Sequence, residues 1–221
     1  MGTVLYFLFS GIEWLALILL TFAMFKFPLK GFRGQILFAS AIMALLSHFI
    51  FEVLELRVIA TLLQPPVIFL ILWQMFRVHI FYAALMTVYG YMGYLFIQYF
   101  FLILMIWMDI PLEVLMPHTN QAYVLQSLSV MTTLVIVGLL YRFRIGYTFV
   151  PDYEYAPLTM RGLNLKLFFL ILGGYGVISI TNFIAFSKST PTLAILNFII
   201  ILGVLLYVAQ RREYIDDRSM G

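Results

Sequence analysis

The chain has 221 residues, of which 64% are hydrophobic and only 10% are charged. Soluble domains carry about a quarter charged residues, so this chain has too few of them to cover a hydrated surface. The composition therefore predicts an integral membrane protein in the cell membrane. The sequence contains no cysteine, which excludes disulfides, thiolate metal sites and thiol nucleophiles.

Charged residues divide the chain into apolar segments of about 20 residues, the length with which an α-helix crosses a bilayer. Barrel strands are about half as long and alternate in polarity, so the pattern favours helices. We predict an all-α fold, a polytopic membrane helix bundle with seven transmembrane helices. Residues 1–210 would form this single domain, and residues 211–221 a short cytoplasmic tail. The predicted spans are Val4–Phe25, Gln35–Val53, Val58–Phe76, Ile80–Met108, Ala122–Tyr141, Leu167–Ser187 and Leu193–Gln210.

The fourth segment decides the topology, because its 29 residues include no Lys, Arg, Asp, Glu or His and are too many for one upright span. If it crosses once, eleven Lys and Arg residues lie on one side of the membrane and only Arg57 and Lys188 on the other. Two crossings would leave five against eight. Because Lys and Arg concentrate in cytoplasmic loops, one crossing is favoured, with the N-terminus outside and the C-terminus in the cytoplasm.

Two pairs of helix-breaking residues are candidate conformational hinges. Pro65 and Pro66 fall within the third predicted span and should kink it, because each proline removes a backbone donor. Gly90 and Gly93 fall within the fourth, where glycine permits either a bend or close contact between helices. Close packing is the simpler interpretation of the glycines.

Polar side chains inside the predicted spans lie mainly toward the outside. An ionisable group in lipid is costly and marks either a functional site or a buried polar contact. His48 and Glu52, with Glu55, follow a spacing of four and three residues and so share one helix face. The functional interpretation is a polar pocket, open to the outside, that binds a ligand. Its candidate residues are Glu13, His48, Glu52, Gln64, Gln98, Gln126, Asn182 and Asn197. The alternative is that these groups hydrogen-bond neighbouring helices and lock the bundle.

The sequence provides no motif for catalysis. The last span lacks the lysine of a retinal pigment. His48 alone among the histidines lies well inside a span, whereas a bis-histidine haem needs two, and no HExxH zinc pair occurs. We therefore expect no enzyme activity, no catalytic residue, no cofactor and no metal site. Membrane lipids are expected partners, and nucleic acid is not.

Three segments resemble a known family. The stretch GIEWLALILLTFAMFKFPLK (Gly11–Lys30) is similar to the opening of the membrane sensor region in accessory-gene-regulator-type, or GHKL-class, sensor histidine kinases of Gram-positive bacteria. VYGYMGYLFIQ (Val88–Gln98) resembles the Gly-Tyr-rich fourth helix of that region, and QRREYIDDR its exit toward the kinase. The resemblance implies six or seven spans and a pocket for an extracellular peptide or small amphiphile, with Glu13 and His48 in its lining. Only ten residues follow Arg211, so we expect a kinase-less relative or a sensor fragment.

The sequence thus favours a sensor or receptor-like protein that binds its ligand outside and signals through a cytoplasmic or membrane partner, or as a homodimer. The first alternative is a small transporter or channel with Glu13 and His48 in its translocation site. A further alternative is a structural or immunity-like membrane protein in which the buried polar groups only hold the helices together.

Overall fold

A computed structural model describes residues 2–54, 60–110, 119–150, 163–188 and 191–219, and every regular element in these ranges is a helix. Side chains between residues 181 and 198 lie outside the description. The elements are α1 (Gly2–Met24), α2 (Arg33–His48), η1 (Phe49–Val53), α3 (Ala60–Leu70), η3 (Ile71–Met75), α4 (Ile80–Trp107), α5 (Asn120–Phe143), α6 (Leu163–Lys188) and α7 (Pro191–Ser219). The predicted all-helical fold is confirmed for the described residues.

Within the part of the chain that the structure describes, four helical segments are long and apolar enough to cross a membrane, namely Val4–Met24, Arg33–Val53, Ile80–Trp107 and Asn120–Phe143. Shorter apolar helices cover Leu62–Met75 and Asn164–Val177. Large apolar side chains remain exposed along them, as a helix in contact with lipid requires. On α5 they recur every three or four residues, at Val124, Leu128, Met131, Val135 and Leu139. These are the helices of a membrane protein.

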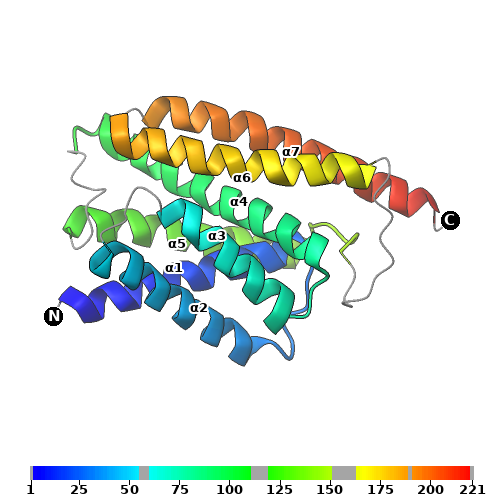
Figure 1. The fold of residues 1–221 in the computed structure, drawn as a ribbon, viewed down its shortest axis with the longest axis horizontal. Helices are drawn as coiled ribbons and strands as arrows, with labels where there is room; N and C mark the ends of the chain where they lie inside the picture. Colours follow the sequence, from blue (N-terminus) through cyan, green and yellow to red (C-terminus); the bar gives the residue numbers. More distant parts are fainter. Residues whose placement is uncertain (1, 55–59, 111–118, 151–162, 189–190, 220–221) are drawn as a thin grey trace.

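The fourth apolar segment forms one helix. α4 runs without a break from Ile80 to Trp107, so the chain does not turn back within it. α4 is also the central helix of the bundle, since it contacts α1, α3, α5, α6 and α7. Figure 1 shows α6 and α7 on one side of α4 and α1, α2 and α3 on the other. The start of α1 and the end of α7 lie at opposite ends of the bundle (Figure 1).

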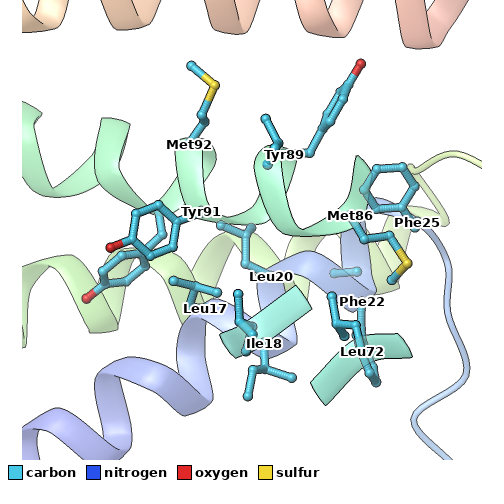
Figure 2. Packing of buried hydrophobic residues seen from close by; sticks show 14 of the residues in the cluster. Leu17, Ile18, Leu20, Phe22, Phe25, Leu72, Met86, Tyr89, Tyr91 and Met92 are labelled. Carbon is cyan, nitrogen blue, oxygen red and sulfur yellow. The ribbon is translucent and has the colours of Figure 1, made fainter. Parts of the chain in front are cut away.

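The core forms where α1 packs against α4. Figure 2 shows Leu17, Ile18 and Leu20 of α1 on one side of α4, with Tyr89 and Met92 on the other. All five side chains are buried. Because lipid is as apolar as leucine, such contacts stabilise the bundle through close packing and dispersion rather than through exclusion of water.

Gly90 allows α1 and α4 to approach closely. A Cβ atom at this position would lie 1.8 Å from Oγ1 of Thr21, whereas at Gly93 the nearest side-chain atom, on Leu20, would be 3.5 Å away. Close packing therefore explains Gly90, and the helix continues through both glycines. Whether these glycines also act as a hinge stays a prediction.

The two prolines lie inside α3, which continues past them to Leu70 before the wider turn of η3. Pro66 has no N–H to donate to the carbonyl of Leu62 four residues earlier. That carbonyl instead accepts a hydrogen bond of 2.7 Å from the hydroxyl of Tyr175 on α6. Pro66 thus frees an acceptor that a neighbouring helix satisfies, and the predicted kink stays a prediction.

The last helix is longer than the sequence predicts. α7 continues to Ser219, through most of the segment expected to be a short tail. Glu213 accepts hydrogen bonds from the backbone N–H and the hydroxyl of Thr148 in the loop after α5, and Arg212 donates one of 2.6 Å to Asn164 at the start of α6. These contacts give the polar end of α7 partners within the bundle, which is a reason for the helix to continue beyond Gln210.

Gly90→Ala should lower the free energy of unfolding by about 1–3 kcal/mol, because the added methyl group would overlap Thr21 and force α1 away from α4. Gly138→Ala is the matched control, since nothing lies within 4 Å of its added Cβ. Thermal unfolding in detergent or nanodiscs measures both. Equal stability of the two variants would contradict the close approach of the helices.

Candidate functional site

The candidate site centres on the carboxylate of Glu13, halfway along α1. Its Oε1 atom accepts hydrogen bonds from the hydroxyl of Tyr94 and from Nε2 of Gln98, each 3.0 Å long. Its Oε2 atom accepts a bond of 3.1 Å from Nε2 of Gln126. One side chain of α1 thus joins α4 and α5, and we call these four residues the Glu13 network.

Helix geometry places the donors. Tyr94 and Gln98 are four residues apart on α4 and so lie one above the other on one face. Gln126 lies in the second turn of α5, whose first turn is capped by the hydroxyl of Thr119, which accepts a bond from the N–H of Ala122. Three predicted site residues, Glu13, Gln98 and Gln126, are therefore brought together.

All three donors to Glu13 are uncharged, and no described Lys, Arg or His pairs with it. An ionised carboxylate has about four acceptor positions, so three bonds leave room for one more. In a membrane, such a group is costly without a compensating positive charge. The network can therefore accept a proton or the cationic group of a ligand.

A second network lies next to the first, starting from the neighbouring residue of α1. Nε1 of Trp14 and Nε2 of Gln64 both donate to the hydroxyl oxygen of Ser47, at 2.9 and 3.1 Å. The hydroxyl of Tyr91 donates to Oε1 of Gln64 at 2.9 Å. This Ser47 network joins α1, α2, α3 and α4, and all its members are buried. Gln64, predicted as a pocket residue, has both ends of its amide bonded within it.

His48 lies in neither network. Its ring packs against Tyr6 and Phe7 of α1, with centroids 5.7 and 4.7 Å away, and its buried Nδ1 atom has no hydrogen-bond partner among the described residues. Glu52 follows in η1 and is half-buried. Glu13, Gln98 and Gln126 thus belong to one hydrogen-bonded network and Gln64 to another, with His48 apart from both; the pocket itself stays a prediction.

The side chains of the remaining predicted site residues lie outside the part of the chain that the structure describes. Asn182 and Asn197 belong to α6 and α7, and their side chains lie outside the described part of the structure. Glu55, on the same predicted face as His48, also lies outside it.

Several polar residues in these contacts escaped the sequence reasoning. Tyr91, Tyr94, Trp14 and Ser47 are not among the site residues predicted from the sequence. The signal lay in the spacing, because Tyr91, Tyr94 and Gln98 recur at three and four residues on one helix face.

Another buried hydroxyl lies further along α5. Ser129 lies one turn beyond Gln126 on α5, is fully buried, and its Oγ atom has no partner among the described residues. Thr133 follows one turn later, also fully buried, and bonds the carbonyl of Ser129.

α4 also contacts α7 through a polar bond. The hydroxyl of Tyr89 donates to the carbonyl oxygen of Leu205, and that of Tyr147, in the loop after α5, donates to the carbonyl of Leu206 at 3.2 Å. Burial, and secondly the nearby carboxylate of Glu213, raise the pKa of Tyr147, so its hydroxyl stays protonated as a donor. The helix that supplies two donors to Glu13 is thus bonded to the helix that ends at Ser219.

Within the described residues, no group of three or more His, Cys, Asp or Glu side chains could hold a metal ion. Comparison of the chain with protein families, curated proteins and solved structures found no match. The functional assignment therefore depends on the chemistry of the networks and on the motifs quoted above.

Glu13→Ala should destabilise the protein by about 2–4 kcal/mol, because it leaves three donors on two helices without an acceptor. Glu13→Gln should cost about 1 kcal/mol or less, since rotation of the Gln126 amide restores a complementary pair. Ile12→Ala is the control, because its side chain faces outward on the same helix. Chemical or thermal unfolding checks the order, and an effect of Glu13→Ala no larger than that of Ile12→Ala would contradict it.

Proposed function

We propose that this protein is a membrane sensor of receptor type, in which the Glu13 network binds the cationic group of a peptide or small amphiphile from outside the cell. The observation that supports this most directly is a carboxylate between three helices whose described partners are all neutral donors. A ligand ammonium group would supply the missing charge and compete with the amides of Gln98 and Gln126. Ligand binding would then change how α1, α4 and α5 are held together.

The proposal includes the orientation and the count of seven spans. Exposed basic residues occur near the ends of α1, η3 and α5 and the starts of α2 and α6, consistent with a cytoplasmic end. In this orientation, Glu13 and Gln126 lie toward the outside. The opposite positions of the first and last helix ends agree with an odd number of crossings.

Transmission would pass through α4. Tyr94 and Gln98 sense the state of Glu13, and Tyr89, more than one turn further along the same helix, bonds α7 at Leu205. A small rotation or shift of α4 would therefore reach the helix whose far end carries Arg212 and Glu213. Pro65, Pro66, Gly90 and Gly93 remain the proposed hinge residues. The chain itself would act through a cytoplasmic or membrane partner, or as a homodimer.

The ligand hypothesis predicts a response that depends on positive charge. A fluorophore attached to a single cysteine at Gln210→Cys should report on α7 without interference, because the chain has no cysteine of its own. A mixture of short apolar peptides with free amino termini should change the emission of the protein in nanodiscs, and the N-acetylated mixture should not. Glu13→Gln should abolish the difference.

A response that survives Glu13→Gln, or no difference between the free and acetylated peptides, would contradict the proposed site. His48→Ala, made in the same labelled protein, tests whether the histidine contributes to the ligand site. Stability measured alongside separates a lost response from a misfolded protein.

Single-cysteine labelling also tests the orientation. A cysteine at Asn120, at the start of α5, should react with a membrane-impermeant maleimide in intact cells, whereas one at Lys30 or Arg144 should react only after permeabilisation. Labelling of Lys30→Cys from outside would reverse the orientation, and equal accessibility of Asn120→Cys and Arg144→Cys from one side would show that α5 does not cross.

A transporter or channel is the second candidate, and the observation that favours it is the buried hydroxyl of Ser129 inward of the Glu13 network. A polar path through both leaflets would need such groups beyond Gln126. Liposomes that contain only this protein distinguish the two functions: flux of protons or small cations that Glu13→Gln abolishes would support transport, and its absence alongside an amine-dependent response would support sensing.

A further inference from the structure

Among the described residues, four other than glycine adopt a left-handed backbone, with φ between 47° and 58°: Lys26, Arg77, Asp109 and Arg144. L-residues with side chains rarely adopt this conformation, and Asp and Asn tolerate it better than Lys or Arg. Three of the four are basic and follow the ends of α1, η3 and α5. The fourth, Asp109, follows the C-terminal end of α4, at the other end of the bundle.

The turns themselves call for glycine. At the end of α1, the N–H of Lys26 bonds the carbonyl of Ala23, and the N–H of Phe27 bonds that of Phe22, which is the Schellman pattern. Arg144 and Ile145 repeat it at the end of α5, and Asp109 and Ile110 at the end of α4. The left-handed position of this motif is most often glycine. The turns themselves therefore do not explain why basic residues occupy two such positions and the related turn after η3.

The three basic residues occupy one end of the bundle. Lys26 and Arg77 adjoin the aromatic cluster of Phe22, Phe27, Phe32 and Phe76, whose ring centroids are 4.9 to 5.7 Å apart. The N–H of Tyr147 bonds the carbonyl of Met24 at 2.8 Å, which holds the loop after Arg144 beside the end of α1. Five more exposed basic residues belong to the segments at this end: Lys30, Arg33, Arg142, Lys166 and Arg211.

The three basic residues in left-handed turns lack acidic partners in the described structure. Lys26, Arg77 and Arg144 are all exposed, and no ion pair joins them to a described carboxylate. Glu213, the acidic side chain described at this end, is already bonded to Thr148. Among the described residues, therefore, no carboxylate competes with an anionic partner from outside the chain for these three cations.

The surroundings indicate that the partner is also apolar. Arg144 stands between Phe143 and Ile145, which are 63% and 58% exposed. Phe143 ends an α5 helix that exposes leucine and valine side chains along its length. A phospholipid with an anionic headgroup has the matching chemistry, because its phosphate meets the cations where its acyl chains meet the apolar residues.

We infer that Lys26, Arg77 and Arg144 form a binding surface for the headgroups of anionic phospholipids in the leaflet at this end of the bundle. The left-handed turns hold these side chains where the helices leave the membrane, and the exposed apolar residues beside them contact the acyl chains. This surface is independent of the proposed ligand at Glu13, and in the proposed orientation it faces the cytoplasmic leaflet.

The test compares unfolding temperatures in nanodiscs of phosphatidylcholine with and without phosphatidylglycerol. Phosphatidylglycerol should raise the midpoint of the wild-type protein, and added salt should reduce the rise. In the triple variant Lys26→Gly, Arg77→Gly and Arg144→Gly, most of the rise should be lost. Its midpoint in pure phosphatidylcholine should not fall, because glycine suits each left-handed turn. Inorganic phosphate in phosphatidylcholine discs should not replace the lipid.

Asp109→Gly is the matched control, since it relieves the same backbone conformation at the other end and should leave the lipid effect unchanged. If the glycine variant does not fold, the triple change to glutamine removes the same charges and keeps side chains at all three turns. A triple variant that responds to phosphatidylglycerol as the wild type does, or a phosphate effect equal to that of the lipid, would overturn the inference.

Discussion

The carboxylate of Glu13 needs hydrogen-bond donors, and this need constrains how the helices of the bundle are arranged. Glu13 lies in an apolar helix, where an unsatisfied charged group is expensive. Its described donors belong to α4 and α5, so α1 must pack between them with a fixed rotation. That rotation turns the next residue, Trp14, toward Ser47 on α2. Two adjacent residues thus orient α1 against helices on both sides.

The polar groups of α4 point in different directions, so this helix forms hydrogen bonds with several of its neighbours. Tyr91, Tyr94 and Gln98 share one face and reach α3 and α1, whereas Tyr89 bonds α7. Figure 2 shows Tyr89 and Tyr91 pointing to different sides of α4. Glycine at position 90 allows α1 to lie close enough to α4 for Tyr94 and Gln98 to bond Glu13. A central helix with such bonds cannot rotate without changing contacts on several sides at once, which is the physical basis for proposing it as the transmitting element.

The two ends of the bundle differ in chemistry. Amides and a carboxylate meet beneath one end, and exposed cations in left-handed turns mark the other. Between them, Tyr89 and the long α7 provide a bonded connection. The ligand proposed for one end and the lipid or partner proposed for the other could therefore influence each other through the same helices.

The sequence alone determined the helices, because runs of about 20 apolar residues between charges leave no other way to satisfy the backbone in lipid. It also singled out Glu13, Gln98 and Gln126, since polar groups within apolar segments stand out. It did not determine which of them meet. α4 is buried on most sides, so its sequence does not show which neighbouring helix the face with Tyr91, Tyr94 and Gln98 meets. Only the packing of helices distant in sequence decided that Gln64 bonds Tyr91 and Ser47, that His48 lies apart, and that Tyr94 completes the site around Glu13.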